Sequence, residues 1–253
     1  MITTITYKEK GYNIDLNNPL DISIPLKSGR PEPNCFYAPL YEAKPLKAGD
    51  FIGSTKAGSP VNFFNIKINP HGNGTHTECV GHISKEEYRL RDCLKSFHCM
   101  AYVFSVLPTL LENGDRLIMR RSLEMLIDPS LDLPEAFIVR TLPNDLEKMQ
   151  RNYSGTNPCY FEPSAIEFLN HRGVNHLLTD LPSVDREEDQ GALLSHKAFW
   201  NYPKKMLKHK TITELIFVKE EIEDGLYFLN IMVGNYDIDV SPSRPILYRL
   251  NEL

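Results

Sequence analysis

The sequence contains no long hydrophobic run and no excess of basic residues. No apolar stretch approaches the roughly 20 residues that a membrane-spanning helix requires. Lysine and arginine together number 28 against 33 aspartates and glutamates, which gives a net charge of −5 and a pI of about 5.9. Nucleic-acid binding would favour a basic surface. These absences favour neither a membrane nor a nucleic acid as the partner of this protein.

Paired cysteines are also lacking. The five cysteines are odd in number, and none are spaced as Cys-x-x-Cys, which excludes a zinc ribbon and favours free thiols in a reducing compartment. The first ten residues do not combine a charged segment with a following apolar stretch, so they do not resemble a signal peptide. We therefore expect a cytoplasmic protein.

The apolar residues present are sufficient for a substantial core. They make up 42% of 253 residues, and no linker divides the chain, so we expect a single domain over residues 1–253. Strands alternating with helices predict an α/β fold. A proline- and glycine-rich region, 28–60, disfavours long elements and is a candidate loop or flap beside a pocket, or an ordinary surface excursion. The strands are expected at 100–107, 136–141, 174–179, 215–218, 226–233 and 245–250, and the helices at 123–127, 163–172 and from a cap at Ser195 to Pro203.

Three of the eight histidines, His71, His76 and His82, fall within twelve residues. In an extended segment, side chains two positions apart point to the same face, so His76 and Glu78 are able to meet one cation. Imidazole and carboxylate ligands together suit zinc or manganese, whereas calcium prefers oxygen ligands alone. Nearby glycines and the spacing argue against the helical His-Glu-x-x-His motif of metalloproteases. A chance clustering of histidines in a polar turn is the alternative.

The letters around these histidines resemble the signature of the metal-dependent cyclase family, which includes the bacterial kynurenine formamidases. Here the run reads Gly74-Thr75-His76-x-Glu78-x-x-x-His82, and the family signature is His-x-Gly-Thr-His-x-Asp-x-Pro-x-His. Further segments similar to those of the family follow in the same order over about 230 residues. They are Asp21-Ile-Ser-Ile-Pro-Leu26, Val139-Arg-Thr141, Leu178-Thr-Asp-Leu-Pro-Ser-Val-Asp185, the positions of His196 and Glu214, and Ser241-Pro-Ser-Arg-Pro-Ile-Leu247.

The resemblance implies a fold and a site. The fold would be the family's swivelling β/β/α arrangement, a mixed and barrel-like β-sheet with flanking helices. The metal ligands would hold one or two zinc or manganese ions, and the family also implies a homodimer or a higher homo-oligomer. Asp180 and Asp185 are expected to order loops rather than to bind metal. By this resemblance the metal ligands are His76, Glu78, His196 and Glu214, and the catalytic histidine is His82.

The sequence departs from the family signature at three positions. The signature's first histidine should stand at position 72, which is glycine, and His71 comes one residue too early. Either the loop bulges and returns His71 to the metal, or this ligand is absent. Glu78 replaces the usual aspartate and Val80 the usual proline, so a fully active two-metal centre is in question.

The resemblance implies a hydrolase acting on a carbon–nitrogen bond other than a peptide bond. The best-fitting family reaction is that of an arylformamidase, which converts N-formylkynurenine to kynurenine and formate with a metal-bound hydroxide and His82 as acid and base. Aromatic residues of the early region would stack on the aryl ring or serve as core residues. The alternatives are a hydrolase of a cyclic amide, imide or lactone, and a divergent metal-binding protein without turnover. These aromatic residues are Phe36, Tyr37, Tyr41, Phe63 and Phe64.

Overall fold

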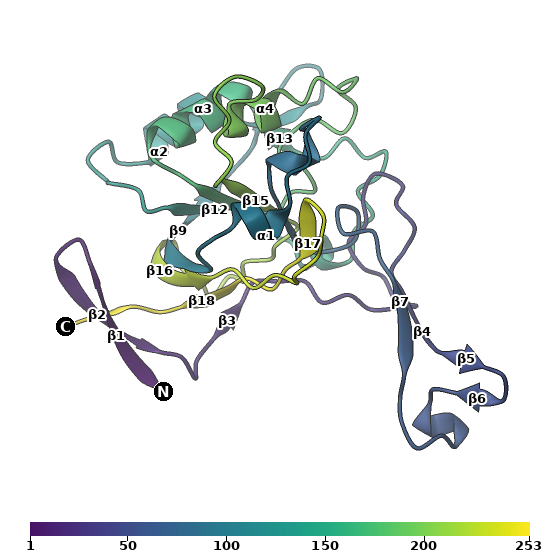
Figure 1. The fold of residues 1–253 in the computed structure, drawn as a ribbon. Coiled ribbons are helices and arrows are strands. Elements are labelled where there is room, and N and C mark those ends of the chain that lie inside the picture. The colour runs from purple at the N-terminus through teal and green to yellow at the C-terminus, as the bar shows by residue number, and fades with distance from the viewer.

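The computed structural model describes residues 1–253 and is built around one curled, nine-stranded sheet with helices packed against it (Figure 1). The strand order across this sheet is β17-β8-β15-β14-β12-β9-β16-β18-β3. The bounds of these strands are β3 Leu20–Asp21, β8 His76–Glu78, β9 His98–Val106, β12 Ala136–Thr141, β14 His176–Thr179, β15 Thr211–Glu214, β16 Gly225–Asn230, β17 Val240–Pro242 and β18 Ile246–Tyr248.

The centre of the sheet is parallel and its two sides are antiparallel. Strands β9, β12, β14 and β15 run parallel, while β8 and β17 on one side and β16, β18 and β3 on the other pair antiparallel. This mixed, curled sheet with flanking helices confirms the predicted α/β fold class. The helices, including the short 3-10 turns η1–η3, are α1 Leu90–Cys93, α2 Arg120–Leu126, α3 Pro163–His171, α4 Leu194–Trp200, η1 Thr55–Ala57, η2 Val80–His82 and η3 Leu146–Met149.

The central strands are buried on both faces. In β12 every residue is buried, and alternate side chains enter two different core clusters. Phe137 and Val139 pack into the cluster that also contains the helix residues Ile166 and Phe199, whereas Ile138 packs on the opposite face. Parallel strands covered on both faces carry continuous apolar runs, and this explains why β9, β12 and β14 were recognisable from sequence.

The predicted helices are present, with one error at a helix start. Helix α3 begins with Pro163, whose fixed φ suits the first helical position, and ends before Gly173, which has a φ of 85°. Ser195 was expected to cap the third helix. It instead lies inside α4, and its hydroxyl donates to the backbone oxygen of Phe161, while Leu193 occupies the cap position with a φ of 46°.

The prediction of a strand at 215–218 was wrong. The strand at this point is β15, Thr211–Glu214, and it stops because Leu215 adopts a φ of 53°, which no regular strand accommodates. Residues 215–218 remain buried, and Ile216 and Val218 belong to the core. The apolar run 215–218 is therefore a core segment with an irregular backbone. The strand is formed by the four residues before it, Thr211–Glu214.

Four small strands form an arm that projects away from the sheet (Figure 1). Its base is the antiparallel pair β4 Glu42–Pro45 and β7 Phe64–Lys67, and its tip carries β5 Lys47–Ala48, β6 Phe51–Ile52 and the turn η1. The proline- and glycine-rich region thus lacks long elements, as expected, and most of it extends outward. The remaining strands are β1 Ile2–Tyr7, β2 Lys10–Asp15, β10 Thr109–Leu110, β11 Arg116–Ile118, β13 Tyr160–Phe161 and β19 Asn251–Glu252.

None of the helices is both long and apolar enough to serve as a membrane span.

Candidate metal centre

Strand β8 presents two of the predicted ligands on one face. His76 and Glu78 are two residues apart, both are buried, and β15 places Glu214 directly opposite His76 in the antiparallel register. The Nε2 atom of His76 lies 3.3 Å from Oε2 of Glu214. His76 Nδ1 lies 3.0 Å from the carbonyl oxygen of Gly74, which can only accept a hydrogen bond. In the neutral ring the proton therefore stays on Nδ1, and Nε2 keeps a free lone pair.

Helix α4 supplies His196 from a distant part of the sequence. Its Nε2 atom lies 3.2 Å from Oε1 of Glu78, and its Nδ1 atom lies 2.6 Å from Oδ2 of Asp185. Asp185 also accepts hydrogen bonds from the backbone N–H groups of Ser195 and His196, so it caps the first turn of α4. The expectation that Asp185 orders a loop is met here, because it fixes both the helix start and the orientation of the His196 ring.

His82 and His71 complete the cluster at its more open side. His82 follows β8 in the turn η2, and its Nδ1 atom lies 3.6 Å from Oε2 of Glu78. His71 Nδ1 lies 3.1 Å from the same oxygen, and the His71 and His82 ring centroids are 4.4 Å apart. Both side chains are about one-third exposed, so this side of the cluster is accessible.

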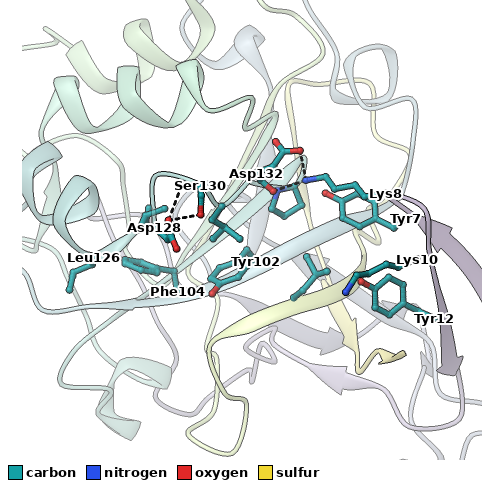
Figure 2. A pocket seen from close by; sticks show the side chains of 14 residues that line it. Tyr7, Lys8, Lys10, Tyr12, Tyr102, Phe104, Leu126, Asp128, Ser130 and Asp132 are labelled. Atoms are coloured by element: carbon teal, nitrogen blue, oxygen red, sulfur yellow. Dashed lines mark hydrogen bonds and ion pairs between the residues drawn. The ribbon is translucent and has the colours of Figure 1, made fainter. Parts of the chain in front are cut away.

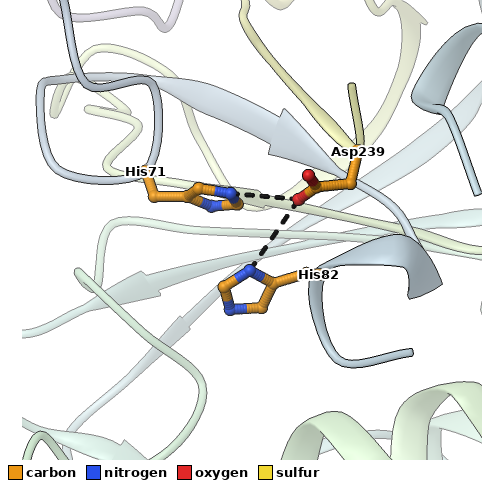
Figure 3. A group of neighbouring side chains, drawn as sticks. All are labelled: His71, His82 and Asp239. Atoms are coloured by element: carbon orange, nitrogen blue, oxygen red, sulfur yellow. Dashed lines mark hydrogen bonds and ion pairs between the residues drawn. The ribbon is translucent and has the colours of Figure 1, made fainter. Parts of the chain in front are cut away.

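Asp239 belongs to the cluster and was missed from the sequence. Its Oδ2 atom lies 3.0 Å from Nε2 of His71 and 3.9 Å from Nδ1 of His82, and the three side chains converge in Figure 3. Asp239 precedes strand β17, whose register places the next residue, Val240, opposite Glu78. The only sequence signal for Asp239 is its place two residues before Ser241-Pro242, a segment that resembles the family. The sequence does not show that β17 pairs with β8 in this register.

Three buried atoms of the cluster that could bind a cation make no hydrogen bond: Nε2 of His76, Nε2 of His196 and Oε1 of Glu78. Their contacts of 3.3 Å (His76 with Glu214) and 3.2 Å (His196 with Glu78) do not have hydrogen-bond geometry. Leaving such buried atoms unsatisfied costs about 1–3 kcal/mol each. Two imidazole nitrogens and carboxylate oxygens form a donor set that suits Zn²⁺ or Mn²⁺. The residues present therefore fit a divalent cation, which would satisfy atoms that the protein itself leaves free.

The ligand atoms form two triads that share Glu78. One triad is His71, His76 and Glu78, and the other is Glu78, His82 and His196; within each, the candidate ligand atoms lie within 4.8 Å of one another. A third group joins His71, His82 and Asp239. Glu78 is thus the central carboxylate. All the residues predicted for the site come together here, including His71.

The charges of the cluster shift its pKa values strongly when no cation is present. Burial opposes ionisation of Glu78, but His82, His196 and His71 around it hold its pKa well below the usual range. Burial also opposes protonation of His196, yet the neighbouring carboxylates of Asp185 and Glu78 raise its pKa to about 10. Burial lowers the pKa of His82 to about 4, so its imidazole is neutral at pH 7. Burial raises the pKa of Glu214, and nearby Glu78 adds to this.

A steric contact explains why position 72 is a glycine and not the histidine of the family signature. A Cβ atom at this position would lie 2.2 Å from Cβ of Ala38, so no side chain fits without displacing the segment 35–38. The backbone oxygen of Gly72 also accepts a hydrogen bond from the N–H of Cys35 at 3.1 Å. A histidine is therefore excluded at 72, whereas the preceding residue, His71, turns its ring toward Glu78.

A cavity of about 340 Å³ opens onto the cluster and is lined by Glu78, His82, His196 and Glu214. Of the five aromatic residues considered for substrate stacking, only Phe36 lines it. Phe63 and Phe64 lie exposed on the arm, so neither is a core residue. The rim also carries Arg186, Glu187 and Asp189. The remaining histidines, His98, His171, His176 and His209, lie outside the cluster.

A larger cavity of about 620 Å³ lies between the β1–β2 hairpin and strand β9 (Figure 2). Tyr7, Tyr12, Tyr102 and Phe104 line it, and Lys8 is bound to Asp132 at 2.6 Å. None of the unpartnered buried atoms faces it, and it contains no histidine. Chemical groups rather than size therefore identify the smaller cavity as the candidate site.

The curled mixed sheet thus brings together a histidine–carboxylate cluster whose ligand atoms fit a divalent cation. The chain belongs to the putative cyclase family, because the model of that family matches residues 14–186, more than half of the sequence.

Several solved structures share the fold. Isatin hydrolase A from Labrenzia aggregata, bound to benzyl benzoate, is 14% identical over 91% of this chain and 93% of that chain, with a TM-score of 0.66. A potential metal-dependent hydrolase with cyclase activity is 15% identical over 91% and 97%, with a TM-score of 0.64. A predicted metal-dependent hydrolase from Bacillus stearothermophilus is 15% identical over 91% and 98%, with a TM-score of 0.60. At these identities the likeness establishes the fold.

Proposed function

We propose that this protein is a metal-dependent hydrolase of an amide-type bond, with an arylformamide such as N-formylkynurenine as its substrate. The observation that carries the proposal is the group of three unpartnered, buried donor atoms of His76, Glu78 and His196 beside a cavity that His82 also lines. When bound, a divalent zinc or manganese ion supplies the Lewis acidity that activates water and polarises a carbonyl group. His76, Glu78, His196 and Glu214 are the residues that would hold it.

His82 has the position and the protonation state of a general base. It lies at the accessible side of the cluster, and its depressed pKa leaves the imidazole neutral at pH 7, ready to accept a proton from water. The proton taken up by His82 then passes to the leaving amine, which needs a donor for the carbon–nitrogen bond to break. Carboxylates of the cluster hold the imidazolium form through their negative charge.

The rim of the cavity supports an amino-acid-like substrate. Arg186 offers a cation for a substrate carboxylate, although its guanidinium also lies 3.3 Å from Asp115. Glu187 and Asp189 offer negative charge for an ammonium group, and Phe36 offers an aromatic face for an aryl ring. N-formylkynurenine carries all three features, and this favours it over an uncharged amide.

A cyclic amide is the second candidate substrate. The specific observation in its favour is the shared fold with isatin hydrolases, which covers 91% of this chain. Ring opening of a cyclic amide requires the same groups of the protein: a site for a cation, a base at His82 and an aromatic contact at Phe36.

The test uses purified protein loaded with Zn²⁺ or Mn²⁺, stripped with chelator, and reloaded. Release of formate from N-formylkynurenine that disappears with chelator and returns with metal supports the first proposal. Ring opening of isatin without formate release would transfer the proposal to the cyclic amide. Bound metal without turnover of either would leave a metal-binding protein and overturn the hydrolase proposal for these substrates.

A further inference from the structure

We propose that the cavity at the carboxyl ends of β12 and β14, the β12–β14 cavity, binds a small organic monocarboxylate through Arg116 and Arg151. Its volume is about 590 Å³. Small-molecule sites typically occupy about 300–1,000 Å³. The β12–β14 cavity shares no lining residue with the cavity beside the histidine–carboxylate cluster. The inference therefore concerns a second ligand and does not depend on the proposed function.

The β12–β14 cavity lies at the edge of the sheet where ligands of parallel sheets commonly bind. Thr141 ends β12, and Asp180 and Leu181 follow the end of β14. Pro108, which follows β9, also lines the cavity. In open α/β sheets, ligands bind in the crevice outside the carboxyl ends of the strands. The next parallel strand, β15, ends in Glu214, so the cavity and the histidine–carboxylate cluster lie at the same edge of the sheet.

Arg116 supplies a positive charge that no acidic residue neutralises. It begins β11 and lines the cavity, and its exposed guanidinium makes no ion pair or hydrogen bond within the chain. Burial raises the pKa of the Cys159 thiol to about 12, and the charge of Arg116 opposes that rise, so the guanidinium acts on the cavity wall. The planar fork of a guanidinium matches the two oxygens of a carboxylate.

Arg151 brings a second guanidinium to the same cavity. It is held over the ring of Tyr153, with 5.8 Å between the guanidinium carbon and the ring centroid, and both residues line the cavity. The acidic neighbour of Arg151 is Glu147, at 3.5 Å, whose side chain is 71% exposed. An ion pair on the surface contributes little, so the guanidinium of Arg151 remains available to a ligand.

Tyr153 adds a hydroxyl that has no partner in the chain. The residue is only 5% exposed, yet its hydroxyl makes no hydrogen bond to another residue. Burial raises the pKa of this hydroxyl well above its usual range, and Asp180 adds to the rise, so the group stays protonated and able to donate. Buried tyrosine hydroxyls usually have a hydrogen-bond partner. A ligand carboxylate between Tyr153 and Arg151 would supply it.

The charges around the cavity fit a singly charged anion. Arg116, Lys148 and Arg151 line it against Asp145 and Asp180, which leaves one positive charge in excess. Lys148 and Asp180 neutralise each other at 2.8 Å. The two carboxylates in the wall would repel a dianion such as a phosphate monoester. Apolar groups for the body of the ligand are also present, from Pro108, Leu142, Pro143, Pro158 and Leu181.

The larger cavity beside the β1–β2 hairpin lacks such free cations. Its two lysines already have acidic partners, because Lys8 lies 2.6 Å from Asp132 and Lys10 lies 2.9 Å from Glu252. Unneutralised guanidinium groups, rather than volume, therefore distinguish the β12–β14 cavity as an anion site.

The test is titration calorimetry of the whole chain with benzoate, a monocarboxylate with an apolar body, and with benzamide, its uncharged counterpart. We expect saturable binding of benzoate and much weaker binding of benzamide, both before and after treatment with chelator. Arg116→Gln and Arg151→Gln should each weaken benzoate binding by roughly tenfold or more, because each removes a charge-assisted hydrogen bond. Tyr153→Phe removes only the hydroxyl and should have a smaller effect. The matched control is Arg121→Gln, an exposed arginine of α2 outside the cavity, with unchanged affinity.

No saturable binding of benzoate, equal binding of benzamide, or unchanged affinity in both arginine variants of the cavity would overturn the inference. Binding that chelator abolishes, or that Arg186→Gln removes, would also overturn it, because benzoate would then lie beside the histidine–carboxylate cluster. Tighter binding of inorganic phosphate at the same site would replace the monocarboxylate by a dianion. Circular dichroism checks that each variant is folded. Absence of amide hydrolysis leaves these results unchanged, so this inference and the proposed function fail separately.

Discussion

The molecule contains two buried charged clusters, and they differ in whether their polar atoms are satisfied. The first is the histidine–carboxylate cluster. The second lies at the ends of β12 and β14, where Nζ of Lys148 donates to Oδ2 of Asp180 at 2.8 Å and to the backbone oxygen of Thr141 at 2.6 Å. Asp180 also accepts from the backbone N–H and the hydroxyl of Thr141.

Lys148 and Asp180 leave no buried donor or acceptor unpaired, whereas the first cluster leaves three. A cavity of about 590 Å³ borders the Lys148–Asp180 pair. Both clusters are therefore buried and lie beside a cavity, so neither property distinguishes one from the other. The difference lies in the free lone pairs. A closed network stabilises one arrangement of the chain, whereas the open one leaves nitrogen and oxygen atoms that fit the coordination of a cation.

The strongest test of this contrast is His76→Ala. Removing a buried ligand nitrogen should abolish tight zinc or manganese binding and, with it, turnover. Elemental analysis after dialysis and a hydrolysis assay measure both. The metal-centre assignment fails if His76→Ala retains the metal content of the natural protein.

His82→Ala should separate chemistry from metal binding. We expect the loss of a general acid–base to reduce kcat by about 10²–10⁴-fold, while the metal content remains that of the natural protein because His76, Glu78 and His196 are intact. A variant with nearly full activity would remove His82 from the mechanism. Loss of metal in this variant would instead make His82 a ligand.

Lys148→Met should affect stability without affecting metal. It leaves Asp180 buried without its cation, and breaking a buried ion pair typically costs about 3–5 kcal/mol. Urea unfolding of the metal-free protein measures the loss, with the exposed Lys204→Met as the control. A change in metal content here, or no change in stability, would contradict the division between a closed and an open cluster.

The smallest expected effect concerns His176, another buried group with a satisfied partner. Its Nδ1 lies 2.8 Å from the hydroxyl of Thr211, and burial lowers its pKa to about 4. Because the unfolded chain takes up this proton near pH 6.5, stability should fall as the pH drops from about 6.5 to 4, by about 2–3 kcal/mol from this group. His176→Gln should flatten that part of the stability curve, and an identical pH dependence in both proteins would disprove the assignment.

Much of the fold and the cluster was predictable because local pattern and global structure agree. The central strands are apolar on both faces, and β12 has the bounds that the sequence predicts. The spacing of His76 and Glu78 placed both on one face of a strand, and His196 and Glu214 arrived from distant segments as the resemblance implied.

The rest depended on information that is not local. Leu215 lies in an apolar run that reads as a strand, but its positive φ turns the chain at the end of β15. Asp239 meets His71 only because β17 pairs with β8 in one particular register, and no residue pattern encodes that pairing. Residues 28–60 were expected to form either a flap beside a pocket or an ordinary surface excursion, and composition alone did not give the direction of the arm.

Asp185 couples the folding of the first turn of α4 to the position of the His196 ring in the site. Its carboxylate holds the N–H groups of Ser195 and His196 and the imidazole of His196, so fraying of the first turn of α4 swings His196 away from Glu78. A cation held by the proposed ligands would resist that local opening, because only the closed turn supplies the nitrogen of His196. Hydrogen exchange at these two amides should therefore slow as the site fills, which makes the start of α4 a built-in reporter of occupancy.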